Sequence, residues 1–132
     1  MGNKVMKDDD IKLFSFQDLK VWQKAVLFAE KVIRTIDKLQ TPRKHYRLIE
    51  QLESASTSVA MNIAEGKGRF SKKEFVHYLY IARGSLFETV SLLILIRRLA
   101  WINEDKLAEL KLLGEEIAKM LNSLIKSVKS GK

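Results

Sequence analysis

The chain has 132 residues and a formal net charge of +8, with no cysteine and one proline. This length suits one domain, and the lack of cysteine excludes disulfide scaffolds, zinc fingers, iron–sulfur sites and thiol catalysis. The hydrophobic fraction of 46% excludes a disordered chain. The longest apolar run, from Leu92 to Ile96, stops at Arg97 and is far short of the ~18–20 residues of a membrane span. We expect a cytoplasmic protein that needs no membrane, metal or cofactor.

Apolar residues recur at alternating steps of three and four in four successive segments, which is the spacing of helices packed side by side. We predict helices over residues 16–39, 42–65, 72–101 and 104–129, forming an all-α four-helix bundle over 14–129. Residues 1–13 lack this periodicity and are predicted to be a mobile tail. The predicted core stripe of the first helix consists of Leu19, Trp22, Val26, Ala29, Ile33 and Ile36.

Signals for helix ends fall at these boundaries. Gly66 is predicted to end the second helix in the left-handed conformation that glycine adopts readily. The connections are short, so successive helices should run antiparallel, up-down-up-down. The predicted N-caps are Ser15, Thr41 (followed by Pro42), Ser71 (in a capping box with Glu74) and Asn103.

The first and third helices carry more apolar surface than one core-facing stripe needs. For the third helix, deep burial in the core of one chain is an equally good explanation. Because two helices share the excess, we predict that it is buried between subunits of a homo-oligomer. The predicted interface residues are Val21, Phe28, Val32, Tyr80, Phe87, Val90, Ile94 and Trp101.

Two groups of cations predict contact with the phosphate backbone of a nucleic acid. The first is a stripe within an ~80° arc of the first helix, which has no acidic residue inside it. The second surrounds the turn before the third helix, whose N-terminus can bind phosphate. The alternatives are a solvated helix face and a solvated turn. The residues are Lys20, Lys24, Lys31, Arg34 and Lys38 in the stripe, and Lys67, Arg69, Lys72 and Lys73 at the turn.

The lysines near the C-terminal end, Lys126, Lys129 and Lys132, are less informative, because cations are favourable at any helix C-terminus. Residues Asn62, Glu65 and Gly66 are predicted to form a structural polar lock between the second and third helices. Glu65 lies at the helix end that disfavours negative charge, so Arg69 is its expected partner. The alternative is a ligand-binding or catalytic role.

Catalytic and metal-binding patterns are scarce. Glu74 and His77 have the Glu-x-x-His spacing of di-iron bundles, but the sequence has no second copy and the capping box explains Glu74. Ser58 and Ser85 have no predicted histidine partner that could activate a nucleophile. We therefore predict no enzymatic activity and no metal site.

Three segments resemble a bacterial family of four-helix bundles encoded in intervening sequences of 23S ribosomal RNA genes. They are residues 16–23 (FQDLKVWQ), residues 60–66 (AMNIAEG) with Arg69, Ser71 and Phe75 after them, and residues 81–88 (IARGSLFE). A related branch is the accessory protein of diversity-generating retroelements. The resemblance implies a ring-like homopentamer without enzymatic activity that associates with RNA or ribonucleoprotein, and with a reverse transcriptase in the retroelement branch. Glu53 and Ser54 depart from the basic residues that the family often carries there.

We predict a non-enzymatic, basic oligomeric bundle that binds RNA or DNA without sequence specificity, or binds a ribonucleoprotein partner. The positive charge of several subunits would add up in such an oligomer and strengthen weak contacts. The alternative is a protein–protein scaffold that makes no direct contact with nucleic acid.

Overall fold

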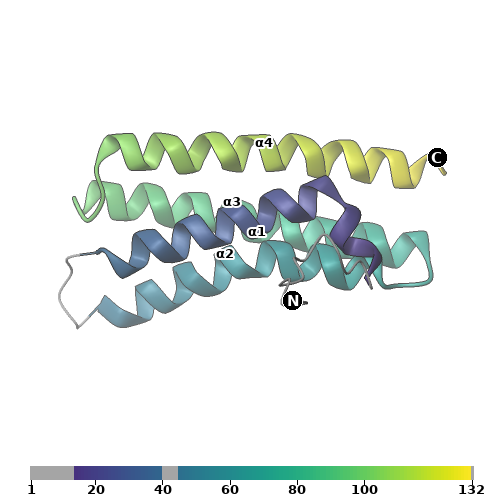
Figure 1. Ribbon diagram of the computed structural model, residues 1–132, viewed down its shortest axis with the longest axis horizontal. Coiled ribbons are helices and arrows are strands. Elements are labelled where there is room, and N and C mark those ends of the chain that lie inside the picture. The colour runs from purple at the N-terminus through teal and green to yellow at the C-terminus, as the bar shows by residue number, and fades with distance from the viewer. Residues whose placement is uncertain (1–13, 40–44, 132) are drawn as a thin grey trace, which may run out of the picture.

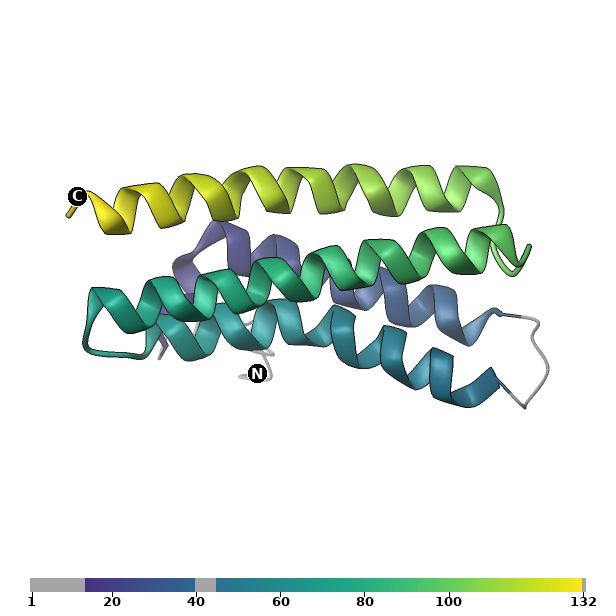
Figure 2. The ribbon, with the colours of Figure 1, turned by 180° about the vertical axis from the view of Figure 1, so that it is seen from behind.

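A computed structural model describes residues 14–39 and 45–131, and they form four long α-helices and one 3-10 turn, without a strand. The long axes of the helices lie side by side (Figures 1 and 2). This confirms the prediction of an all-α protein with four helices. The elements are η2 (Ser15–Asp18), α1 (Lys20–Asp37), α2 (Tyr46–Lys67), α3 (Lys72–Arg98) and α4 (Glu104–Lys129).

One hydrophobic core runs between the four helices. Each helix packs against two others: α2 and α4 each contact both α1 and α3. The largest fully buried side chains come from all four helices and include Phe28, Leu52, Leu86 and Ile117. This closed arrangement leaves each helix one inward face, and the rotation of each helix decides which residues occupy it.

The core face of α1 differs from the predicted one. Val21, Phe28 and Val32, which we predicted at an interface between subunits, are buried in the core of their own chain. Val26 from the predicted core stripe is instead 37% exposed. The apolar arc of α1 is wider than one stripe, so periodicity alone could not select the half that faces inward. Packing against α2 and α4 makes that choice.

The start of α1 also differs from the prediction. Ser15 lies inside η2, Phe14 takes the N-cap position, and Leu19 is extended, so α1 begins only at Lys20. This break lets the Phe16 ring fold back onto the Trp22 ring, with 5.0 Å between the ring centroids. A continuous helix from residue 16 would have lost that aromatic contact.

The connection between α2 and α3 shows why glycine is required at position 66. The prediction that Gly66 ends α2 in a left-handed conformation is wrong. The helix continues to Lys67, and Gly66 does not have a positive φ. A Cβ atom at Gly66 would lie 2.7 Å from Cβ of Tyr78, which is closer than real contacts. Gly66 therefore allows α2 and α3 to approach each other closely. The predicted Thr41 and Pro42 start of this helix lies outside the described residues.

The two predicted caps that begin α3 and α4 are confirmed. Ser71 Oγ accepts a hydrogen bond from the backbone N–H of Glu74, and Asn103 Oδ1 accepts one from the N–H of Lys106. Helix α3 ends at Arg98 rather than at residue 101. Ala100 takes a positive φ of 62°, and the N–H of Trp101 bonds back to the carbonyl of Ile96.

Helix α3 is the one helix of the described residues that is long and apolar enough to cross a membrane by length and composition alone. It buries seven residues, including Leu79, Leu86 and Leu93, against the rest of the chain. Core helices of soluble proteins share this property, and the absence of a membrane partner stays a prediction.

The rotation of α1 can be tested by truncating one residue on each side of it. We expect Phe28→Ala to lower the free energy of unfolding by about 3–5 kcal/mol, because it opens a cavity in the core. Val26→Ala should cost less than about 1 kcal/mol, because Val26 is partly exposed. Urea denaturation of both variants measures the difference, and equal costs would contradict the observed rotation.

The close approach at Gly66 can be tested against a second helical glycine. Gly66→Ala should destabilise the protein by about 1–3 kcal/mol, since the methyl group collides with Tyr78. Gly84 lies inside α3 with no atom near an added Cβ. Gly84→Ala should therefore stabilise the protein by up to about 1 kcal/mol through helix propensity. Thermal unfolding of the two variants should shift in opposite directions.

Candidate nucleic-acid interface

Two of the cations predicted along α1, Lys24 and Lys31, border α4 rather than lying opposite the core. Since α1 turns Val21 and Phe28 inward, its basic stripe faces acidic residues of α4. Three of the five cations form ion pairs: Lys24 with Glu116, Lys31 with Glu109, and Arg34 with Glu30. No ion pair within residues 14–39 and 45–131 includes Lys20 or Lys38. No acidic residue lies within this stripe on α1 itself, but two carboxylates of α4 neutralise part of its charge in the folded chain.

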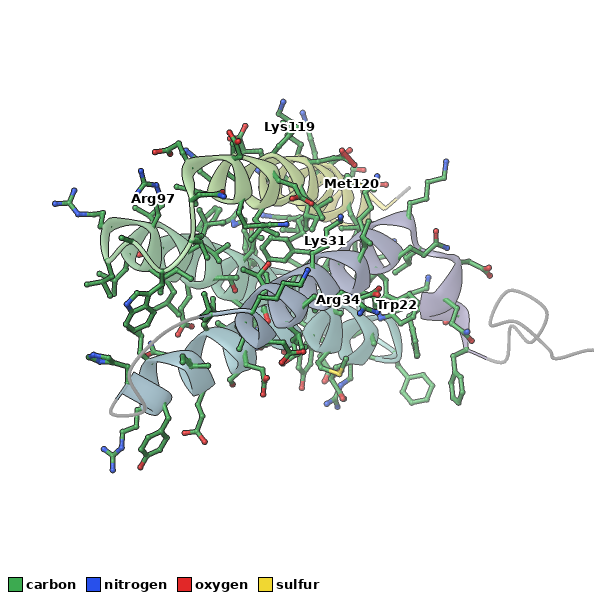
Figure 3. The ribbon with its side chains drawn as sticks, turned by 60° about the vertical axis from the view of Figure 1, so that its left-hand side comes forward. Trp22, Lys31, Arg34, Arg97, Lys119 and Met120 are labelled. Carbon is green, nitrogen blue, oxygen red and sulfur yellow. The ribbon has the colours of Figure 1, made fainter. Side chains whose placement is uncertain are left out.

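Three of the predicted cations nevertheless meet at a hollow of about 350 Å³ between α1 and the start of α4, which we call the α1–α4 hollow. In Figure 3 Lys31 lies between α1 and α4, whereas Lys119 projects from the other side of α4. Helix α4 adds a fourth cation to the lining and one carboxylate. The lining residues are Lys31, Arg34, Thr35, Lys38, Leu39, Trp101, Ile102, Asn103, Lys106 and Glu109.

Glu109 organises the α1–α4 hollow. Its carboxylate accepts hydrogen bonds from Lys106 Nζ at 2.9 Å and from Lys31 Nζ at 3.0 Å. These two ammonium groups, Lys106 first, hold the pKa of Glu109 below its usual 4.5. The carboxylate therefore stays ionised and keeps both lysines at the rim. Each ammonium has three donors, so both retain hydrogen-bonding capacity for an anion.

The aromatic ring of Trp101 borders the same hollow. The Trp101 ring packs against the His45 ring, with 5.1 Å between centroids. Trp101 is partly buried and packs on the core, and it also lines the α1–α4 hollow. Sequence reasoning assigned Trp101 to a subunit interface, because helical spacing does not reveal that the chain turns sharply at Ala100.

The cations at the α2–α3 turn are arranged less favourably for phosphate. Arg69 bonds Glu65 Oε2 and Tyr78 Oη, both at 2.7 Å, and its guanidinium lies over the Tyr78 ring. Lys67 lies over the Phe75 ring. A hollow of about 300 Å³ at this turn is lined by one cation, Arg69, and two carboxylates, Glu65 and Glu74. Lys72 and Lys73 are exposed.

Asn62 belongs to a small polar network between α2 and α3. Its side-chain amide donates to the carbonyl oxygen and to Oγ of Ser58, both at 2.8 Å, and Ser85 Oγ donates to Ser58 Oγ at 3.0 Å. Glu65 pairs with Arg69, the partner expected for it. Sequence reasoning missed Ser58 and Ser85 as partners of Asn62, although Ser58 lies one helical turn before it. The donors of the Asn62 amide and of the Ser85 hydroxyl are thus satisfied within the network, which suits a structural lock.

The predicted apolar row of α3 borders a groove between α3 and α4. Phe87 is 56% exposed, and Ile94 and Tyr80 are also exposed. The groove, which we call the α3–α4 groove, has a volume of about 310 Å³ and few polar atoms. It is lined by Leu86, Phe87, Val90, Ser91, Ile94, Lys111, Gly114, Glu115 and Ala118. Gly114 deepens the groove, because a Cβ atom there would lie 3.2 Å from Val90 Cγ2.

Residues suited to metal binding do not cluster in the described part of the chain. No group of three or more histidine and acidic side chains could hold an ion there. Glu74 instead accepts a hydrogen bond from Ser71 Oγ at the start of α3. His77 lies against the Tyr78 ring.

The described residues define a small all-α protein of four helices, and comparison with known proteins gives the family. Residues 17–123 match the model of the 23S rRNA-intervening sequence protein family. The chain belongs to this family. No curated protein matches the chain. A solved structure from Bacteroides thetaiotaomicron, a protein of unknown function from the S23 ribosomal protein family, is 28% identical, with a TM-score of 0.75. The match covers 80% of this chain and 95% of that one.

Proposed function

We propose that this protein is a non-enzymatic, basic four-helix bundle that binds the phosphate backbone of RNA or DNA without sequence specificity. Membership of a family named after 23S rRNA intervening sequences supports a connection with RNA. The net charge of +8 supports attraction to any polyanion. An antiparallel up-down-up-down order of the helices, a cytoplasmic location and a homo-oligomeric state are parts of the same proposal.

The observation that carries this proposal is the α1–α4 hollow. Its lining has four cations, Lys31, Arg34, Lys38 and Lys106, and a single carboxylate. Glu109 forms ion pairs with two of these cations, Lys31 and Lys106. Its single negative charge does not balance the positive charge of all four. Lys38 lacks a carboxylate partner among the described residues. Trp101 offers an apolar ring at the edge, and such rings stack on unpaired bases.

Reversing one charge in the hollow should weaken nucleic-acid binding. We expect Lys38→Glu to lower the affinity for structured RNA and duplex DNA about tenfold. The slope of log affinity against log salt should fall by about 0.9, because one phosphate contact is lost. Filter binding at low and moderate salt measures both quantities.

The matched control is Lys119→Glu, which changes the net charge equally on a part of α4 that lies away from the hollow. It should leave the affinity within about twofold of the unmodified protein, since only distant screened charges change. Absence of binding at low salt would refute the proposal. Equal effects of the two substitutions would refute the role of the α1–α4 hollow.

The α3–α4 groove supports self-association through α3. Phe87 and Ile94 are large, apolar and exposed beside a groove with few polar atoms. Surfaces of this kind are typically buried in subunit interfaces. The interface proposed here keeps Phe87, Val90 and Ile94 and omits the buried residues of α1. A ring-like homopentamer is the arrangement that the family resemblance suggests.

A charged residue at the centre of this surface should reduce self-association. We expect Phe87→Lys to convert the oligomer to a monomer, because the partner subunit would have to bury an unpaired ammonium. Leu112→Lys is the control, since Leu112 is 69% exposed on α4 and does not line the groove. Light scattering at micromolar concentration gives the mass, and a monomeric unmodified protein would refute self-association.

The second candidate function is a scaffold that binds another protein, such as a ribonucleoprotein component or a reverse transcriptase. The α3–α4 groove favours it, because a helix of a partner can bind in an apolar groove between two helices. A complex that survives nuclease treatment would support the scaffold. Loss of the complex after nuclease treatment would support nucleic-acid binding.

A further inference from the structure

A second basic hollow lies near the C-terminal end of α4, on the side that faces α3. In Figure 2 this end of α4 lies alongside the first half of α3. The hollow has a volume of about 450 Å³, and we call it the Arg83 hollow. It contains three cations and no carboxylate. The lining residues are Arg83, Asn122, Ile125, Lys126, Lys129 and Ser130.

Neighbouring side chains hold Arg83 in place. Its Nη1 donates to Asn122 Oδ1 at 2.7 Å, and its guanidinium carbon lies 4.9 Å from the centroid of the Tyr80 ring. Lys129 Nζ lies over the same ring at 5.9 Å and 3.4 Å from Tyr80 Oη. A guanidinium has five N–H donors, and this contact with Asn122 uses one of its terminal nitrogens. Arg83 is therefore positioned while most of its donors remain available.

The three positive charges have no neutralising partner in the part of the chain that the structure describes. None of its ion pairs includes Arg83, Lys126 or Lys129. Glu115, which also lies on α4, lines the α3–α4 groove instead. The C-terminal dipole of α4 favours the two lysines, but Arg83 lies in the middle of α3, far from any helix end. A bound anion would relieve the mutual repulsion of Arg83, Lys126 and Lys129.

We propose that the Arg83 hollow binds a phosphate group. A planar guanidinium donates two parallel hydrogen bonds to phosphate oxygens, and two ammonium groups balance the remaining charge. A phosphate carries more oxygens and more charge than a carboxylate, so it suits three converging cations better. The ring of Tyr80 is already covered by Arg83 and Lys129, so it supports the cations rather than stacking on a base.

This site is separate from the α1–α4 hollow and does not depend on it. Lys106 and Lys126 are 20 residues apart on α4, which corresponds to about 30 Å along the helix. The two hollows also lie on different sides of α4, one toward α1 and the other toward α3. Substitutions in one hollow therefore leave the residues of the other unchanged.

Inorganic pyrophosphate is the probe that tests the site. Titrated into 15N-labelled protein, it should shift the side-chain N–H signals of Arg83 and Asn122 in a saturable manner. Lys126→Gln should weaken this binding about tenfold, because one charge-assisted contact is lost. Arg83→Gln should abolish it, and a thermal unfolding curve like that of the unmodified protein shows that the variant is folded.

Lys119→Gln is the matched control, because Lys119 is also an exposed lysine of α4, two helical turns before Lys126, and does not line the hollow. It should bind pyrophosphate like the unmodified protein. The proposal is overturned if pyrophosphate shifts neither signal, or if Lys126→Gln and Lys119→Gln bind it equally well.

A competition experiment then distinguishes the source of the phosphate. Displacement of pyrophosphate by a short single-stranded oligonucleotide identifies the site as one for the nucleic-acid backbone. Undiminished pyrophosphate binding in the presence of the oligonucleotide identifies it as a site for small phosphate compounds. Both results retain the phosphate site, whatever happens at the α1–α4 hollow.

Discussion

Burial of the Phe28 ring in the hydrophobic core fixes which face of α1 turns inward in this fold. Phe28 is fully buried, and a Cβ atom at Gly114 would lie 3.8 Å from its ring and 3.2 Å from Val90. A methyl group at Gly114 would be tight against Val90 of α3 and in ordinary contact with the Phe28 ring, so the glycine lets α4 lie close to α3 beside this ring. With Phe28 turned inward, the basic stripe of α1 must face α4, where Glu109 and Glu116 meet it.

The charge distribution follows from that orientation. Two carboxylates of α4, Glu109 and Glu116, form ion pairs with α1. Only Glu109 lines the α1–α4 hollow, where it lies among four cations. The side of α4 that faces α3 near its C-terminal end contributes Lys126 and Lys129 and no carboxylate to the Arg83 hollow. The net charge of +8 is therefore concentrated in particular places rather than spread evenly. Attraction between a polyanion and such places depends on local charge, since salt screens distant charges.

Among the four helices, α3 has the most large apolar side chains exposed to solvent. Helix α1 contributes Val21 and Phe28 to the core and keeps Val26 and Leu27 partly exposed. Helix α3 keeps Phe87 and Ile94 exposed beside the α3–α4 groove. The Arg83 hollow lies along the same pair of helices, nearer the end of α4. Self-association and anion binding can therefore use adjacent parts of one face without sharing residues.

The sequence by itself determined that the chain is all-α with four helices, where α3 and α4 begin, and which family it belongs to, because periodicity, capping residues and short motifs are local signals. Only the tertiary structure decided the rotation of α1, since an apolar arc wider than one stripe fits the core in two ways. It also decided which cations are paired, because Glu109 and Glu116 are distant in sequence from Lys31 and Lys24. Arg83 and Lys126 meet for the same reason: charges that converge across two helices leave no pattern along the chain.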